Sequence, residues 1–246
     1  MRDAYAAALH GAVYRIDPRL RVVDGTHGVA PGDVLAAAYH AKALALAFGP
    51  GTVVCAVVDP GVGSGRGAVA ADCAGVRCVA PDTGAATYLW AEAPAQRRAC
   101  VRLATPPEAT ATFHGRDLFA PVAARLAAGA ALRDCGSPHP APLLVEEAFV
   151  RRQGSVLSAR VAVVDHFGNA ITTLRRGDVG AARVLRAAWP GGASESLART
   201  YAEAGPGPVL VWGSTGHLEV AASGRPVAAV GGPALGAQVR IEVEGG

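Results

Sequence analysis

The chain carries little charge and few aromatic side chains. Of its 246 residues, 17% are charged and 5% are aromatic, whereas 51% are hydrophobic. This composition excludes a chain that is disordered throughout, because a real hydrophobic core is available. The net charge of +3 is small, and no basic stripe interleaved with aromatic residues is present. Nucleic-acid binding is therefore disfavoured.

Cysteine is also scarce, and its spacing matches no metal motif. The five cysteines are odd in number and contain no C-x-x-C pair, which disfavours both zinc and a complete set of disulfides. We expect free thiols in a reducing cytoplasm, and a site that uses neither a metal nor a cofactor. The cysteines are Cys55, Cys73, Cys78, Cys100 and Cys135.

Several other signatures are missing. Gly, His or Asp interrupts every long apolar run, so we expect no membrane span. The opening residues Met1-Arg2-Asp3 lead directly into a helical pattern, which does not resemble a signal peptide. The sequence has no G-x-S-x-G elbow and no H-E-x-x-H pair. Serine-esterase and zinc-protease chemistry therefore have no support.

The first half of the chain alternates between helical and strand patterns. The apolar run TVVCAVVDP, residues 52–60, predicts a central parallel strand. We therefore expect an α/β domain over residues 1–137, built on a largely parallel sheet with flanking helices. The other expected elements are helices over 3–14, 33–48, 83–93 and 116–129, a strand over 21–25 and a hairpin over 67–80.

The second half is rich in strand patterns. The segment 135–144 contains three prolines and no periodicity, so we expect the linker there. A smaller all-β domain is expected over residues 138–246, as a barrel or as two packed sheets. Its expected strands cover residues 155–165, 169–174, 208–214, 217–223 and 237–243.

The segment VVDPGVGSGRG, residues 57–67, holds the first candidate site. The strand pattern delivers Asp59 to its carboxyl end, where open α/β sheets bind ligands. A dinucleotide motif would need glycine where Arg66 stands, and it would need a helix in place of the hairpin pattern that follows. Asp59 and Arg66 are therefore candidates for a polar site, and the ordinary alternative is an ion pair that fixes a glycine-rich turn.

The segment TFHGRDLFAP, residues 112–121, supplies the second candidate, His114. Its ordinary interpretation is a loop residue before a helix that Arg116 and Asp117 begin. Together, however, Asp59, Arg66 and His114 provide what water activation without a metal requires. Aspartate can orient the imidazole, histidine can hold or accept a proton, and arginine favours hydroxide through its charge.

Two further segments combine turn residues with groups that recognise ligands. In VVDHFGNAITT, residues 163–173, Phe167 can stack on a flat heterocycle, and Asn169 can pair with its edge. In WGSTGHLEVAASG, residues 212–224, Ser214 lies in a polar turn whose backbone N–H groups can bind a carboxylate. The ordinary alternative for both segments is a simple hairpin turn.

These motifs occur together in an order and spacing that resemble the S-adenosyl-L-methionine (SAM) hydroxide adenosyltransferases, the adenosine-forming SAM hydrolases related to fluorinase and chlorinase. The likeness rests on VVDPGVGSGR, APDTG, TFHGRDLFAP, VDHFGNAITT and GSTGHLEVA. It implies hydrolysis of SAM to adenosine and L-methionine. It also implies a homotrimer in which each active site lies between the α/β domain of one subunit and the β domain of the next.

The resemblance assigns a role to each candidate. Asp59, Arg66 and His114 correspond to the water-activating residues. The halogenating relatives carry tyrosines at the positions of Asp59 and His114, and the fluorinase has an insertion near 73–78 that this chain lacks. Water is therefore favoured over halide.

The resemblance also implies substrate contacts at both ends of SAM. Asp3, Asp165 and Ser214 correspond to contacts at the methionine end. Phe167 and Asn169 correspond to the adenine site. The second domain therefore supplies most of the implied binding residues.

The chain departs from the family pattern at three points. The family opens with a strand that ends in T-D-F-G, whose aspartate binds the ribose hydroxyls, whereas this chain begins at Met1-Arg2-Asp3. Thr83 and Ser223 stand where the family usually has asparagine. The departures leave two alternatives to a working hydrolase: a relative that binds SAM or adenosine without turnover, and a SAM-dependent halogenase.

Overall fold

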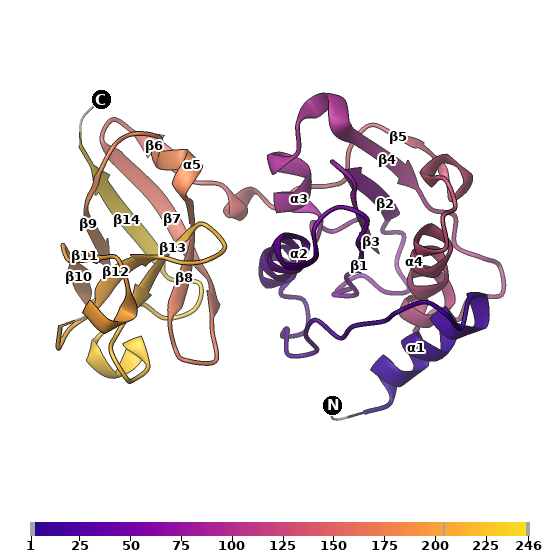
Figure 1. Ribbon diagram of the computed structural model, residues 1–246, viewed down its shortest axis with the longest axis horizontal. Helices are drawn as coiled ribbons and strands as arrows, with labels where there is room; N and C mark the ends of the chain where they lie inside the picture. Colours follow the sequence, from indigo (N-terminus) through magenta and orange to yellow (C-terminus); the bar gives the residue numbers. More distant parts are fainter. Residues whose placement is uncertain (1–2, 204, 245–246) are drawn as a thin grey trace. The chain divides into compact units, whose positions relative to one another are not determined.

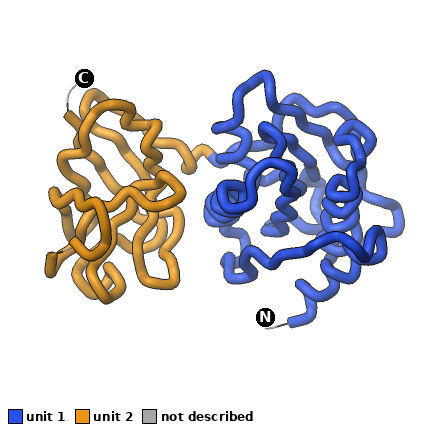
Figure 2. Tube along the Cα trace, in the orientation of Figure 1, with its two compact units in different colours: residues 1–145 blue, residues 146–246 orange. Residues whose placement is uncertain are grey.

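The computed structural model describes residues 3–203 and 205–244 (Figure 1). The chain divides into two compact units, Met1–Val145 and Glu146–Gly246 (Figure 2). The division falls later in the chain than the expected boundary at residue 137. The reason is that the proline-rich segment is tied to the first unit: the Leu143 N–H donates to the Asp82 carboxylate at 2.7 Å, and the Val145 N–H donates to the Thr87 hydroxyl at 2.9 Å.

Helices in the first unit lie close to where the sequence predicts them. Asp33 caps α2 by accepting a hydrogen bond from the Ala36 N–H at 2.9 Å, and Gly49 ends the helix at φ +74°. The third helix is shorter than expected. The helices are α1 (Tyr5–Ile16), α2 (Val34–Phe48), α3 (Thr87–Glu92), a π helix (Gly115–Phe119) and α4 (Ala120–Ala127), with 3-10 turns at Ala95–Arg97 and Leu132–Asp134.

The sheet of the first unit is mixed, so the prediction of a largely parallel sheet is wrong. Its order is β1-β3-β2-β4-β5, and within the described ranges only β1 and β3 pair in parallel. The predicted hairpin is the cause, because it places β2 beside β3 in antiparallel register. The strands are β1 (Val53–Cys55), β2 (Ala68–Cys73), β3 (Val76–Pro81), β4 (Arg98–Arg102) and β5 (Ser137–His139).

Two other strand predictions in this unit are also wrong. The run 52–60 forms a strand only over β1, which lies at an edge of the described sheet and not at its centre. The remainder of the run continues as a loop that carries Asp59. Residues 21–25 form no strand, and most of them are exposed.

The side chains of β2 alternate between two apolar layers. Val69 and Ala71 pack with residues of α2 and α3, whereas Ala68 and Ala70 pack with residues of α4. This alternation follows from the two-residue period of a strand. Both faces of the sheet are therefore covered by helices, and the core leaves the loops at the strand ends free to carry polar groups.

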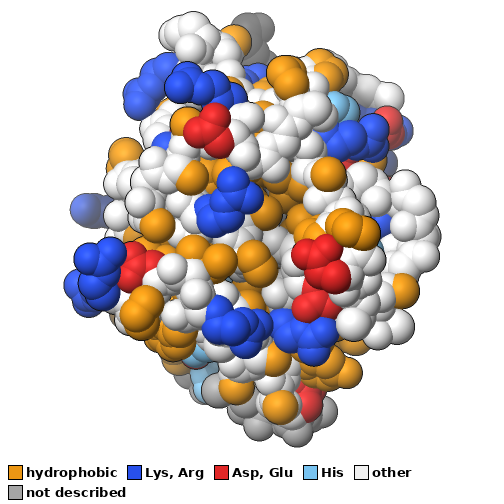
Figure 3. All heavy atoms as spheres, turned by 90° about the vertical axis from the view of Figure 1, so that its right-hand side faces the viewer, with side chains coloured by type: hydrophobic (Ala, Val, Ile, Leu, Met, Phe, Trp, Pro, Cys, Tyr) orange, Lys and Arg blue, Asp and Glu red, His pale blue; other side chains and the backbone are white. Residues whose placement is uncertain are grey.

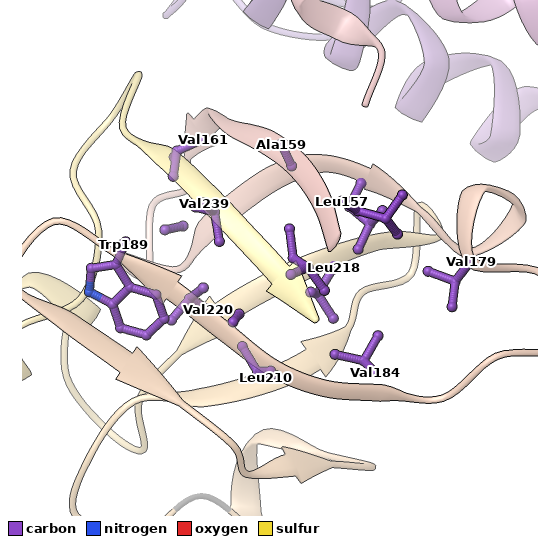
Figure 4. Packing of buried hydrophobic residues seen from close by; sticks show 14 of the residues in the cluster. Leu157, Ala159, Val161, Val179, Val184, Trp189, Leu210, Leu218, Val220 and Val239 are labelled. Atoms are coloured by element: carbon purple, nitrogen blue, oxygen red, sulfur yellow. The ribbon is translucent and has the colours of Figure 1, made fainter. Parts of the chain in front are cut away.

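The second unit is a barrel-like β structure, as the sequence predicts. Its strands follow the order β10-β9-β14-β7-β8-β13-β12-β11, and β6 pairs with β7. Their inward side chains form one apolar cluster around Trp189, Leu210 and Leu218 (Figure 4). The strands β9 and β10 were not expected.

All five strands expected in this unit are confirmed. The elements are β6 (Arg151–Gln153), β7 (Val156–Val164), β8 (Ala170–Arg175), α5 (Arg176–Val179), β9 (Val184–Trp189), β10 (Gly192–Ser194), β11 (Leu197–Ala198), β12 (Val209–Trp212), β13 (His217–Ala221) and β14 (Gln238–Val243), with 3-10 turns at Glu146–Ala148, Tyr201–Glu203 and Val227–Val230.

Candidate functional site

Arg66 joins Asp59 and His114 into one buried cluster in the first unit. Its Nε–H donates to Asp59 Oδ1 at 2.9 Å, and its Nη2 donates to Asp59 Oδ2. Nη2 also lies 2.8 Å from His114 Nδ1. The side chains of Arg66 and Asp59 are 9% and 8% exposed, and His114 is 7% exposed. The structure thus brings the three predicted residues together, but Arg66 and not Asp59 contacts the imidazole.

This arrangement decides which nitrogen of His114 carries a proton. A guanidinium has hydrogen-bond donors and no acceptor, so Nδ1 must accept from Arg66. In the neutral imidazole the hydrogen therefore lies on Nε2. The free side of the ring is a hydrogen-bond donor, and a second proton on Nδ1 would face the positive charge of Arg66.

The glycine-rich loop after β1 folds back on itself and thereby places Arg66 against Asp59. The Gly61 N–H donates to Asp59 Oδ1 at 3.2 Å, and the Ser64 hydroxyl donates to the Gly61 carbonyl at 2.7 Å. The Arg66 N–H in turn donates to Ser64 Oγ at 3.3 Å. The ordinary interpretation, an ion pair that fixes a glycine-rich turn, is thus part of the structure. His114 adds a third group to it.

A π helix places His114 at the start of the segment that begins α4. The Ala120 N–H donates to the Gly115 carbonyl, five residues earlier. Pro121 follows directly and has no N–H with which to continue an ordinary helical ladder. A side chain at Gly115 would come within 3.2 Å of Val57, so glycine allows this turn to pack close to the strand run that leads to Asp59.

Arg116 and Asp117, from the same motif, belong to a separate structural contact. Asp117 accepts hydrogen bonds from the Thr110 N–H and hydroxyl, at 2.9 and 2.6 Å, and from Arg116. The hydrogen bond from Arg116 is the main reason that the pKa of Asp117 lies well below its ordinary value. The pair lies in the π helix and fastens the preceding loop. The ordinary interpretation is therefore right that Arg116 and Asp117 stand at the start of a helix, but His114 is buried and is not merely a loop residue.

A hollow of about 380 Å³ lies beside Asp59. Its walls are the segments 29–32 and 57–60, and their side chains are apolar apart from Asp59. A pocket of this kind, mostly apolar with one charged group, is typical of small-molecule sites. Asp59 lines this hollow, whereas Arg66 and His114 lie behind it and are not part of its walls.

Asp165, Phe167 and Asn169 lie in the turn between β7 and β8. Asp165 Oδ1 accepts from the backbone N–H groups of Phe167 and Asn169 at 2.9 and 2.8 Å, and the Asn169 amide donates to Asp165 Oδ2 at 3.0 Å. Asn169 is 6% exposed, whereas Phe167 is 74% exposed. The polar groups thus build the hairpin turn, and the Phe167 ring is left open to solvent within its own unit.

Ser214 lies at the other end of β8. It is exposed in the turn between β12 and β13, whose Gly216 carbonyl accepts from the Arg176 N–H at 2.9 Å just after β8. The antiparallel pairing of β8 with β13 separates this turn from Asn169 by the length of the strand. Asp3, in the first unit, is exposed and accepts from the Tyr5 N–H at 3.0 Å before α1.

Sequence reasoning missed two residues beside these groups. The Arg66 guanidinium lies 5.2 Å from the ring centre of Phe119, which is fully buried. In the second unit, Glu219 is 4% exposed and accepts from the Tyr201 hydroxyl at 2.7 Å. Phe119 lies in the motif GRDLFAP and Glu219 in the motif HLEVA. Phe119 was passed over as an ordinary apolar residue, and Glu219 as an ordinary strand residue, so the sequence gave no sign of these contacts.

Three expected absences concern metals, membranes and nucleic acid. Within residues 3–203 and 205–244, no group of three His, Cys, Asp or Glu side chains is placed to hold a metal ion. No helix in that part of the chain has the length and apolarity that a membrane crossing requires. On the face that Figure 3 shows, the Lys and Arg side chains lie in several separate groups among hydrophobic, acidic and other residues.

Comparison with known proteins gives consistent matches along the chain. The model of the SAM hydroxide adenosyltransferase N-terminal domain matches residues 1–136, and that of the C-terminal domain matches residues 159–240. An (R)-S-adenosyl-L-methionine hydrolase from Salinispora tropica is 37% identical over 98% of this chain and 94% of its own length. One from Thermus thermophilus is 39% identical over 90% of this chain and 88% of its own.

Solved structures agree with these matches. A conserved protein from Thermotoga maritima superposes with a TM-score of 0.85 at 27% identity, covering 98% of this chain and 96% of its own. A conserved protein from Thermus thermophilus gives 0.76 at 35% identity, covering 98% and 95%. Both family models match in order, and the buried Asp59, Arg66 and His114 cluster lies within the first. The chain belongs to the SAM hydroxide adenosyltransferase family.

Proposed function

We propose that this protein hydrolyses SAM to adenosine and L-methionine. The observation that carries the proposal is the buried Asp59–Arg66–His114 cluster beside an apolar hollow. The curated relatives named above, which are hydrolases of (R)-S-adenosyl-L-methionine, support the same activity. SAM is the substrate in this proposal, and the reaction needs no separate cofactor.

The chemistry of SAM suits such a cluster. Its sulfonium leaves as the neutral thioether of methionine, so the leaving group needs no proton. Water attacks the ribose C5′ in line with the C5′–S bond, a C–O bond forms, and the C–S electron pair passes to sulfur. One proton is released for each SAM consumed. The protein must therefore align the water, exclude bulk solvent and accept that proton.

The three residues divide this work in a way that their contacts support. A carboxylate offers about four acceptor positions, and the described contacts of Arg66 and Gly61 use three of them on Asp59. In the proposal, the attacking water donates its hydrogen bond to Asp59 and accepts one from the Nε2–H of His114. Asp59 receives the proton during attack, and Arg66 holds both partners in place.

Residues of the second unit are proposed to bind the two ends of the substrate. The exposed Phe167 ring stacks on adenine and Asn169 pairs with its edge, while Ser214 contacts the methionine carboxylate. A strand of six residues such as β8 spans roughly 20 Å, so its two ends suit an extended nucleoside–amino acid conjugate. Asp3 is proposed to complete the methionine end. The resemblance also implies a methionine contact for Asp165, but its hydrogen bond from the Asn169 amide puts it at the adenine end of β8 in this arrangement.

We further propose a homotrimer in which the first unit of one subunit meets the second unit of the next. Neither unit alone holds both the water-activating cluster and the exposed Phe167.

The described cysteines are free thiols, which fits a reducing cytoplasm.

Hydrolysis in ¹⁸O-labelled water tests the activity. Attack at C5′ puts the solvent oxygen into the adenosine 5′-hydroxyl, so mass spectrometry should find one ¹⁸O in adenosine and none in methionine. EDTA treatment should leave the rate unchanged. Adenosine without the label, or no adenosine at all, would contradict the proposal.

The same preparation distinguishes the alternatives. A relative that only binds SAM would show heat of binding by calorimetry without any product. A halogenase would convert added chloride or fluoride into 5′-halo-5′-deoxyadenosine. The carboxylate of Asp59 argues against the halogenase, because a negative charge at the attacking position repels a halide ion.

A further inference from the structure

Arg66 contacts an aromatic ring in addition to its two polar partners. Its edge donates to Asp59 and His114, while its guanidinium carbon lies 5.2 Å from the ring centre of Phe119. The ring is 0% exposed. Contact with an aromatic face leaves the in-plane N–H groups of a guanidinium free for hydrogen bonds. Phe119 thus packs against Arg66 and supplies no acceptor that would compete for its donors.

His114 and Phe119 both reach Arg66 because of the π helix between them. They are five residues apart, and in an α-helix that spacing puts side chains about 140° apart around the axis. The i to i+5 hydrogen bond from the Ala120 N–H to the Gly115 carbonyl widens the turn. It therefore brings positions five apart back to the same side, where His114 contacts Nη2 of Arg66 and the Phe119 ring lies against the guanidinium carbon.

We propose that Phe119 is a positioning residue for the hydrolytic reaction, and that the π helix Gly115–Phe119 exists to place it and His114 together on Arg66. The inference rests on the proposed role of Arg66. Phe119 acts through Arg66 alone, which keeps His114 Nδ1 in its accepting state and the Nε2–H turned toward the water.

Stepwise fluorination of the Phe119 ring tests this role, because it lowers the electron density of the ring face while it leaves the shape of the ring nearly unchanged. Fluorinated phenylalanines with one, two and three fluorines at position 119 weaken the attraction of the ring face for a cation progressively. We expect kcat to fall stepwise to about one tenth, with the KM for SAM within about twofold. The pH–rate profile should also change, because a looser Arg66 no longer holds Nδ1 as an acceptor.

Two matched controls separate positioning from packing. The same fluorinated series at Phe149, whose ring lies 5.6 Å from Arg175 in the second unit, should leave kcat unchanged. Leu118→Ala removes a buried side chain from the same π helix, and it should lower the melting temperature without moving the pH profile. Phe119→Leu should lower kcat more than its effect on melting explains, and Phe119→Tyr, which keeps the ring, should recover part of the loss.

The imidazole itself gives a readout that does not depend on turnover. Nitrogen NMR should show His114 as the Nε2–H tautomer in the wild type, and Phe119→Leu should mix the two tautomers. If the wild type makes no adenosine but the tautomer still responds to position 119, the proposed function fails and the positioning role stands. If neither kcat nor the His114 spectrum follows fluorination, the positioning role is overturned.

Discussion

At the scale of single residues, the site depends on the directions in which hydrogen bonds run. Arg66 can only donate, so its contact at 2.8 Å makes His114 Nδ1 an acceptor and leaves Nε2 as the donor. In the proposed reaction, histidine therefore stabilises the oxygen that attacks, and the carboxylate of Asp59 takes its proton. The three side chains work as a unit because each fixes the protonation or orientation of the next.

Replacing Arg66 by lysine tests this dependence. Lysine keeps the charge but cannot donate in a plane to Asp59 and His114 at once, so we expect kcat to fall about 100-fold with little change in KM. Steady-state assays of adenosine release measure both parameters. The matched control is Arg77→Lys, at an arginine paired with Asp72 elsewhere in the first unit, which should keep nearly full activity. Equal losses in both variants would contradict the assigned role.

Glu219 gives a prediction about stability and pH. Burial raises its pKa above the ordinary value of 4.5, although the hydrogen bond from Tyr201 opposes the shift. The folded state then binds this proton more tightly than the unfolded state, so the contribution of Glu219 to folding weakens as pH rises through the raised pKa.

Glu219→Gln removes that titration. Urea unfolding at about pH 4 and pH 7 should show the variant gaining stability relative to the wild type at the higher pH. Glu147→Gln, at an exposed position, controls for the loss of one negative charge. A constant difference between Glu219→Gln and the wild type at both pH values would refute the prediction.

Local motifs predicted most of the candidate site, but not its internal contacts. Asp59, Arg66 and His114 were identified because each stands beside glycines or at the end of an apolar run, where side chains are available for chemistry. The sequence did not show that Arg66 would stand between the other two, because that order depends on how the loop folds back. It also gave no sign of Phe119, since an apolar residue in a helix normally indicates only a core position.

At the scale of elements, sequence analysis correctly predicted the helices and strands whose formation depends on nearby residues. The hairpin of β2 and β3 turns at Ala74-Gly75, both at positive φ, and its residues alternate clearly. The run 52–60 was misjudged because continuous apolar residues suit either a central strand or a loop packed under helices. The π helix was not expected, although Pro121 is its visible cause.

The turn between β7 and β8 offers a test of an element that carries proposed binding residues. Gly168 has φ +84°, and an added Cβ would lie 2.4 Å from Pro226. We expect Gly168→Ala to lower the free energy of unfolding by about 3 kcal/mol or more, because strain and a clash combine.

Gly231→Ala is the matched control for that substitution. Gly231 has φ +78° in the left-handed region with nothing within 4 Å of an added Cβ, so only backbone strain of about 1–2 kcal/mol should appear. Chemical denaturation of the two variants and the wild type measures the difference. Equal destabilisation by both substitutions would show that the Pro226 contact does not hold the turn.

At the scale of the whole molecule, the proposed site is divided between the two units. The water-activating cluster belongs to Met1–Val145, and the exposed Phe167 belongs to Glu146–Gly246. The sequence indicated both units, because alternating helical and strand patterns give way to mostly strand patterns near residue 140. The division of the contacts falls later than the expected boundary, because a proline-rich segment without periodicity can still be fastened by side chains such as Asp82.

Mixed oligomers test whether the two halves of one site come from different chains. His114→Gln disables the first unit, and Phe167→Ala should weaken SAM binding through the second. If each site joins the first unit of one chain to the second unit of its neighbour, random co-assembly leaves about one quarter of sites intact. The co-expressed and co-purified mixture should then have a kcat/KM well above the mean of its parents.

A mixture of the Asp59→Asn and His114→Gln variants, which are both changed in the first unit, is the control and should not recover activity. Activity no higher than the parental mean in the first mixture would place the whole site within one chain.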